Sequence, residues 1–145
     1  MNMIHPSPLL KTALRADALL SGAAGVLQLA AADRLAALIE MPRALLAGSG
    51  EFMLVYALAL LVLASRHRLP SWLVMFVVIG NLLWALACLA LPSAGALALN
   101  PAGIGFLLVH VVSVTVWAGL EWLGLRRSVA ATPGPLPRPA PEHSA

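Results

Sequence analysis

Residues 69 to 120 contain no Asp, Glu, Lys or Arg, and this uncharged stretch constrains the fold more than any other feature. About 20 consecutive apolar residues span the hydrocarbon core of a bilayer, so the stretch is long enough for two crossings and a turn. Hydrophobic residues make up 61% of the chain and charged residues 10%, whereas soluble domains contain about 45–50% and about 25%. A chain of 145 residues cannot bury that much apolar surface in water. The sequence therefore predicts an integral membrane protein.

Hydropathy and helix-breaking residues divide the chain into four predicted transmembrane helices, so the predicted fold class is an all-α, four-helix membrane bundle. The spans are residues 12–32, 44–65, 71–91 and 101–125. Each is long enough to cross a ~30 Å hydrocarbon core at ~1.5 Å per residue. Proline lies at or beside the span boundaries, where its missing N–H costs least, at Pro42, Pro70, Pro92 and Pro101. Asn100 predicts an N-cap for the fourth span, with Pro101 at its first helical position.

Three segments outside the spans complete the predicted organisation around a membrane domain of residues 12–127. Residues 1–11 form an N-terminal cytoplasmic segment, and Asp33 to Met41 form a short amphipathic helix lying in the membrane interface. Residues 128–145 are rich in proline and poor in large apolar side chains, which is typical of a disordered tail. The start of the chain also resembles a cleavable secretory signal, yet polar residues inside its apolar run favour a retained helix.

The distribution of basic residues predicts the orientation. With both termini in the cytoplasm, the inner side carries seven of the nine Lys and Arg residues: Lys11, Arg15, Arg66, Arg68, Arg126, Arg127 and Arg138. Because basic residues favour cytoplasmic loops, the predicted topology has both termini in the cytoplasm. The net charge of +3 does not indicate nucleic-acid binding, since the basic residues are scattered at helix ends and form no stripe.

Each predicted helix gathers its polar and small side chains on one face, at the ~100° per residue of an α-helix. Lipid cannot satisfy polar groups, so these faces should meet in a polar seam inside the bundle. The candidates for ligand binding or proton relay are Gln28, Glu51, Asn81, Trp84, His110 and Trp117. Two charged candidates lie nearer the inner surface, Asp17 and Glu121. We interpret them as carboxylates that reach the headgroups beside arginines.

These candidates have structural interpretations as well as functional ones. Asn81 and Gln28 fit interhelical hydrogen bonds as well as ligand contacts. Glu51 is either a carboxyl near the outer interface or a functional group, since carboxyls inside membranes mark ion and substrate paths. His110 fits a packing histidine, a proton relay or an axial haem ligand, although one membrane histidine cannot supply two axial positions. Trp84 and Trp117 fit packing between helices.

The sequence contains no motif of a soluble enzyme. It lacks the P-loop, GxGxxG, HExxH and GxSxG patterns. The single cysteine, Cys88, excludes an intrachain disulfide, a CxxC redox pair and a cysteine metal cage. We therefore predict no catalytic residue, no metal and no cofactor, with haem or quinone at His110 and Trp117 as an alternative. The glycines in 48–50 and 103–105 predict either close helix contacts or a local loosening of the helix.

A resemblance to known membrane proteins covers about residues 13 to 127. Its most specific marks are Asn81 with Trp84, and Glu121 ahead of the sequence GLRR. The chain resembles an uncharacterised family of small four-helix bacterial inner-membrane proteins, which implies this fold and location. It is also loosely similar to DoxX-like membrane proteins, in which a proline leads into a small-residue run with a glutamate, as from Pro42 to Glu51. Some DoxX-like proteins are membrane subunits of thiosulfate or quinone redox systems.

These features predict a non-enzymatic multi-pass protein that acts as a membrane subunit or as a module binding a small molecule or lipid. Glu51, Asn81 and His110 are the side chains most expected to contact a ligand. The alternatives are a small proton-coupled transporter and a redox subunit using quinone or haem. Four helices are few for an alternating-access pathway, so a transporter would need a homo-oligomer. The expected partners are the lipid bilayer and either copies of this chain or a larger membrane complex.

Overall fold

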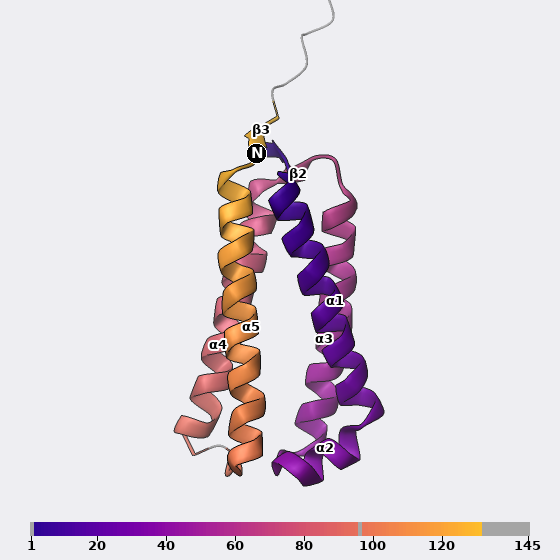
Figure 1. The fold of residues 1–145 in the computed structure, drawn as a ribbon, viewed down its shortest axis with the longest axis vertical. Coiled ribbons are helices and arrows are strands. Elements are labelled where there is room, and N and C mark those ends of the chain that lie inside the picture. Colours follow the sequence, from indigo (N-terminus) through magenta and orange to yellow (C-terminus); the bar gives the residue numbers. More distant parts are fainter. Residues whose placement is uncertain (1, 96, 132–145) are drawn as a thin grey trace, which may run out of the picture.

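The computed structural model of the protein describes residues 2–95 and 97–131, which form five α-helices and three short β-strands (Figure 1). The helices are α1 (Pro8–Ala30), α2 (Ala32–Ile39), α3 (Arg43–Ser65), α4 (Ser71–Ser93) and α5 (Pro101–Arg126). The strands are β1 (Met3–His5), β2 (Leu69–Pro70) and β3 (Val129–Ala130). A short helix is present where the sequence predicts one between the first two spans.

Three of these helices, α3, α4 and α5, are each long and apolar enough to cross a membrane. Helix α1 meets the same criterion only together with α2, to which it is joined at a bend of 89°, so this pair can count as a fourth span. By helix length and apolar composition, the structure is therefore compatible with a small membrane protein. Helix α1 begins at Pro8, earlier than the predicted residue 12, and α4 continues through Pro92 to Ser93.

The ends of two helices follow from side-chain capping. Ser7 caps α1, because its hydroxyl accepts a hydrogen bond from the Leu10 N–H at 3.2 Å. Asn100 caps α5 by accepting from the Gly103 N–H at 2.9 Å, so the N-cap predicted at Asn100 is confirmed. The Asn100 amide nitrogen also donates to the Leu38 carbonyl of α2 at 2.9 Å. One side chain thus starts α5 and holds it against α2.

The long helices form two pairs that lie side by side, α1 with α3 and α4 with α5 (Figure 1). Helix α1 also packs against α5 and so joins the two pairs, whereas α3 and α4 share no extended packing over their described residues. Helix α2 lies across the end of the molecule opposite the strands and packs against α3 and α5. The helices therefore pack in the order α3, α1, α5, α4. Helices α3 and α4 are the first and last of this order and share no extended packing.

Helices α1 and α3 approach each other closely where glycine provides the space. A Cβ added to Gly25 would lie 2.8 Å from the Gly50 carbonyl oxygen, and one added to Gly50 would lie 3.1 Å from the Gly25 carbonyl oxygen. The predicted close contacts are confirmed for Gly50 and for Gly103, which packs against α2. At Gly48 and Gly105 an added Cβ would meet no described atom of another helix within 4 Å, so these two glycines make no close helix contact.

A three-stranded antiparallel sheet, in the order β2-β1-β3, closes the end of the molecule where the described chain begins and ends (Figure 1). Strand β1 pairs Ile4 with Leu69 on one edge and with Ala130 on the other. The sequence predicts no strand in residues 1–11 or 128–145, because segments this short carry no period-two pattern. The all-α prediction is incomplete here. Residues 132–145 of the predicted disordered tail lie outside the described residues.

Candidate functional site

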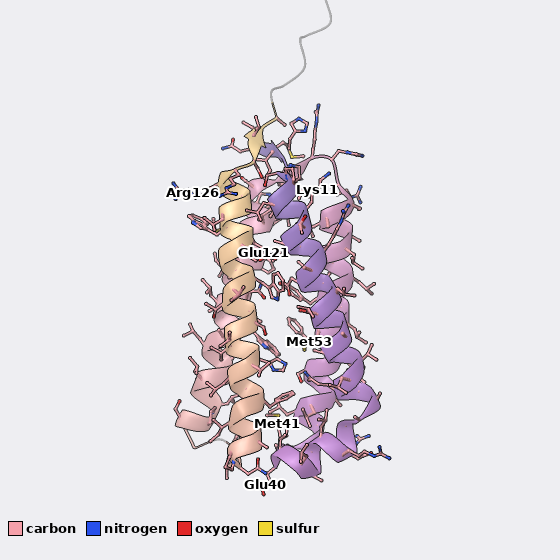
Figure 2. The ribbon with its side chains drawn as sticks, in the orientation of Figure 1. Lys11, Glu40, Met41, Met53, Glu121 and Arg126 are labelled. Carbon is pink, nitrogen blue, oxygen red and sulfur yellow. The ribbon has the colours of Figure 1, made fainter. Side chains whose placement is uncertain are left out.

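Four helices converge on a group of polar side chains that we call the carboxyl cluster. Its members are Asp17 and Ser21 of α1, Tyr56 of α3, Asn81 of α4 and Glu121 of α5. Both carboxyl side chains are 0% exposed, and Asn81 is 4% exposed. Asp17 and Ser21 share one face of α1 because they are one helical turn apart. Figure 2 shows Glu121 in the half of the molecule that carries Lys11 and Arg126.

Asp17 accepts hydrogen bonds from three side chains. The Ser21 hydroxyl donates to Asp17 Oδ1 at 2.8 Å, within α1. On Asp17 Oδ2, the Tyr56 hydroxyl lies at 3.0 Å and Asn81 Nδ2 at 3.2 Å, and both come from other helices. A buried carboxylate needs such donors in place of the water that it has lost. The surroundings of Asp17 therefore stabilise a negative charge on this side chain.

Asn81 connects the two carboxyls. Its Nδ2 donates to Glu121 Oε2 at 3.2 Å as well as to Asp17, and its Oδ1 lies 3.1 Å from the Tyr56 hydroxyl. The opposite amide orientation would place an oxygen against two carboxyl oxygens, so the network determines how the amide points. The Tyr56 hydroxyl has one proton and two acceptors within reach, Asp17 and Asn81.

Glu121 has fewer partners than Asp17. Its Oε1 is buried and has no hydrogen-bond partner among the described residues. No nitrogen of a described Lys, Arg or His lies within 4 Å of either buried carboxyl, since the ion pair that the described residues form joins Arg43 to Asp33 near α2. The interpretation of Asp17 and Glu121 as carboxylates that reach the headgroups is therefore wrong. The carboxyls of Asp17 and Glu121 both face the interior of the protein, because the hydrogen-bond donors of the other helices lie there.

A second polar group, the amide–histidine cluster, joins α1, α3 and α5. Its members are Gln28, Ser49, Met53 and His110. Gln28 is 1% exposed, and its Oε1 accepts a hydrogen bond from the Ser49 hydroxyl. Its Nε2 lies 3.3 Å from Met53 Sδ and 3.3 Å from His110 Nε2. Figure 2 shows Met53 about halfway along the helices, between Glu121 and Met41.

The hydrogen bonds of His110 identify its neutral tautomer. His110 Nδ1 lies 3.0 Å from the Phe106 carbonyl oxygen, which can only accept, so Nδ1 carries the proton. Nε2 is then unprotonated and accepts from Gln28 Nε2. Both ring nitrogens are therefore bound within the protein. Within residues 2–95 and 97–131, no three His, Cys, Asp or Glu side chains gather closely enough to hold a metal ion.

The residues predicted from the sequence separate into two clusters, as two depths in the seam were expected, but Asn81 lies with Asp17 and Glu121 rather than with Gln28 and His110. Gln28 and His110 lie in one cluster and Asn81 in the other. Glu51 is exposed on α3, and its side chain forms no hydrogen bond with the described side chains of either cluster. This exposure contradicts a place for Glu51 in the interior with Asn81 and His110, and it is compatible with the other interpretation, a carboxyl near the membrane interface. No described side chain forms a hydrogen bond with Glu51 that would hold its carboxyl in the interior.

Helix α3 contributes three cluster side chains that the sequence does not predict, namely Ser49, Met53 and Tyr56. They recur at spacings of four and three residues and so share one helical face. The predicted polar face runs through Glu51 and Val55 instead. Because α3 is apolar almost all round, hydropathy does not distinguish its faces. The one available signal is Tyr56, the single tyrosine of the chain, because a hydroxyl inside a membrane requires a partner.

An apolar groove lies between α3 and α4 and reaches the carboxyl cluster. Its volume is about 400 Å³, and its polar lining comes from Ser21, Tyr56 and Asn81. The walls include Val55 of α3 and Phe76 of α4, which are 68% and 70% exposed. The groove exists because α3 and α4 share no extended packing along their described residues.

A smaller cavity of about 140 Å³ lies beside the amide–histidine cluster and is lined by Gln28 and His110. Trp84 lines both cavities, so its ring forms part of the wall between them. This half-buried ring stacks on Phe52 of α3, with the ring centroids 5.3 Å apart and the planes at 10°. Trp117 is half-buried and lines neither of these two cavities. Of the two predicted tryptophans, only Trp84 thus lies at a candidate site.

The chain matches no family model, no curated protein and no solved structure with which it was compared. The functional conclusion therefore rests on the geometry of the two polar clusters and of the groove. Together these features describe a small helical membrane protein with an apolar surface groove that ends at hydrogen-bonding side chains.

Proposed function

We propose that this membrane protein binds a lipid-soluble small molecule in the groove between α3 and α4 and catalyses no reaction. The observation that carries the proposal is the groove itself, a cavity of about 400 Å³ with apolar walls that ends at Tyr56 and Asn81. Ligand cavities have volumes of about 300–1,000 Å³ and combine apolar linings with a few polar groups. The ligand has an apolar body along the walls and a hydrogen-bonding group at Tyr56 and Asn81.

The exposure of the walls favours entry from the bilayer. Val55 and Phe76 are among the most exposed large hydrophobic side chains of the protein, and both line the groove. In a membrane such surfaces face acyl chains, so a lipid-soluble molecule reaches the groove without first entering water. Its polar group then exchanges a hydrocarbon environment, which offers no hydrogen bonds, for the Tyr56 hydroxyl and the Asn81 amide.

The proposed topology has four spans, with α2 in the interface and both termini in the cytoplasm of a bacterium, so that the protein lies in the inner membrane. The positions of the basic residues support this orientation. Those at or near the end that carries the small sheet are Lys11, Arg15, Arg66, Arg68, Arg126 and Arg127. Arg34 and Arg43 lie near α2 at the opposite end.

Several expectations from the sequence stay predictions beside this proposal. They are a proton-coupled transporter, a redox subunit that uses quinone or haem, a relationship to DoxX-like proteins, and assembly into a homo-oligomer or a larger membrane complex.

The proposal is tested by native mass spectrometry of the full-length protein in detergent, with solvent extraction and mass analysis of whatever co-purifies. The groove-filling variant is Gly80→Phe. Gly80 lines the groove, and a Cβ there meets no described atom within 4 Å, so a phenyl ring enters the groove without disturbing helix packing. The matched control is Gly119→Phe, which adds the same ring at an exposed glycine of α5 that is not part of the groove lining.

We expect wild type and Gly119→Phe to retain one apolar small molecule per chain. Gly80→Phe should retain about tenfold less, which corresponds to a loss of about 1.4 kcal/mol of binding free energy. A wild-type protein that carries no such molecule would remove the basis of the proposal. Equal retention by the two variants would show that a bound molecule lies somewhere other than the groove.

A further inference from the structure

We propose that Glu121 is a proton-binding site, a buried carboxylic acid that holds and releases one proton beside an ionised Asp17. The observation behind this proposal is the unequal supply of donors to the two buried carboxyls. Ser21, Tyr56 and Asn81 all lie within hydrogen-bond distance of Asp17, whereas Asn81 is the one described donor within reach of Glu121, whose carboxyl also lies within hydrogen-bond reach of the Asp17 carboxyl. Glu121 Oε1 is fully buried and has no partner there. A proton on Oε1 turns this isolated oxygen into a neutral hydroxyl.

Charge balance leads to the same assignment. Two carboxylates in one water-free site repel each other, and such pairs commonly share one proton. No described basic nitrogen lies within 4 Å of either carboxyl to balance the charge instead. Since the three donors around Asp17 compensate a negative charge there, the shared proton resides on Glu121.

The other groups that face Glu121 supply no counter-charge among the described residues. Helix α1 presents the carboxyl of Asp17, α3 presents the phenol of Tyr56, and α4 presents the neutral amide of Asn81. The remaining basic or titratable side chains of α1 and α5 are half-buried or exposed, and none has a nitrogen within 4 Å of either carboxyl: Lys11, Arg15, His110 and Arg126. The acid is thus surrounded by one other acid and by neutral groups.

An inorganic cation does not fit the same position. Such an ion requires several oxygen ligands that converge on it. Asn81 instead directs its Nδ2 toward oxygens of both carboxyls at 3.2 Å, so N–H groups occupy the space where an ion would be held. Turning the amide over would break both of these hydrogen bonds. A proton needs no such rearrangement.

Tyr56 connects the proton site with the surface of the groove. Its hydroxyl lines the groove and lies within hydrogen-bond distance of both Asp17 and Asn81. Release of the proton from Glu121 strengthens the attraction of this carboxyl for the Asn81 amide, and the Tyr56 hydroxyl can then shift its one proton between its two acceptors. The proton site does not require an occupied groove, so it is tested separately from ligand binding.

The test is infrared spectroscopy of the full-length chain in lipid vesicles, in H₂O and D₂O and over a pH series. A protonated carboxylic acid has a C=O stretching band separate from the amide and carboxylate bands, and D₂O shifts it. We expect this band in the wild type at neutral pH and its loss in Glu121→Gln. Glutamine imitates the neutral acid and can still accept from Asn81, so circular dichroism should show the full helix content. Glu51→Gln is the control and should keep the band, because Glu51 is exposed.

A second measurement uses the unaltered protein. Dicyclohexylcarbodiimide reacts with protonated carboxyls in membranes, and peptide mass spectrometry locates the adduct. We expect the adduct on Glu121 and not on Asp17, with less labelling as the pH rises. A helical wild type without the band, a band that persists in Glu121→Gln, or labelling of Asp17 alone would each overturn the proposal. A band that appears only after Na⁺ is removed would overturn it in favour of a cation site.

Discussion

The carboxyl cluster and the amide–histidine cluster both place buried polar groups among apolar helices, but they compensate these groups differently. In the amide–histidine cluster, a neutral donor meets a neutral acceptor at each step, from Ser49 to Gln28 and from Gln28 to His110. In the carboxyl cluster, two acids share the donors, and one carboxyl oxygen of Glu121 has no described partner. A neutral polar group is thus satisfied by a few neighbours, whereas a buried charge requires donors from several helices.

The two clusters also differ in the helices that they join. Both contain side chains of α1, α3 and α5, but only the carboxyl cluster includes α4, through Asn81. Since α3 and α4 share no extended packing over their described residues, the bond between Tyr56 and Asn81 and the stacking of Phe52 on Trp84 link two helices that border the groove. The following predictions measure whether this contrast between the clusters is energetic as well as geometric.

The largest effect is expected for Asp17→Ala, which removes the shared acceptor of the carboxyl cluster. The Ser21 hydroxyl loses its partner, while Tyr56 and Asn81 each lose one of two acceptors. An unsatisfied buried donor costs about 1–3 kcal/mol, so we expect the free energy of unfolding to fall by about 3 kcal/mol. Circular dichroism during SDS titration in detergent micelles measures this change. Asp33→Ala, at an exposed acid, is the control and should leave the unfolding curve unchanged.

An intermediate effect is expected for Gly25→Ala, which separates α1 from α3 beside the amide–histidine cluster. The new Cβ would lie 2.8 Å from the Gly50 carbonyl oxygen, which is backbone and cannot rotate away. Overpacking of this kind costs about 1–3 kcal/mol in the same titration. Gly48→Ala adds the same methyl group into open space and should be neutral or slightly stabilising, because alanine is the better helix former. Equal behaviour of the two variants would contradict the close approach of the helices.

The smallest effect is expected for Gln28→Leu, which removes the central amide of the neutral cluster at similar volume. His110 Nε2 loses its donor, but the Ser49 hydroxyl keeps a hydrogen bond to the Leu46 carbonyl at 3.0 Å. Interhelical hydrogen bonds inside membranes contribute about 0.6–2 kcal/mol, so we expect a loss of about 1 kcal/mol. A loss as large as that of Asp17→Ala would show that the two clusters do not differ in energy.

The polar members of both clusters are visible in the sequence, because an Asp, Gln, Asn, His or Glu inside a long apolar run is costly in lipid and must have a partner. Asp17, Gln28, Asn81, His110 and Glu121 are all recognised as candidates in this way. Their partners are less visible. The choice between Glu51 and Tyr56 on α3 depends on the rotation of one helix about its axis, and an almost wholly apolar helix contains no pattern that determines it.

The features that the sequence determined by itself are local. They are the starts of the helices that follow Pro42, Pro70 and Asn100, and the length of these apolar helices, which is sufficient to cross a membrane. Capping, proline geometry and hydropathy act within a few residues, so they can be read along the chain. The tertiary structure alone decided the pairing of Ile4 with Leu69 and Ala130, the convergence of three donors on Asp17, and the groove between α3 and α4. These features join segments far apart in sequence, and packing selects them because each buried polar group must find its partner across the helices.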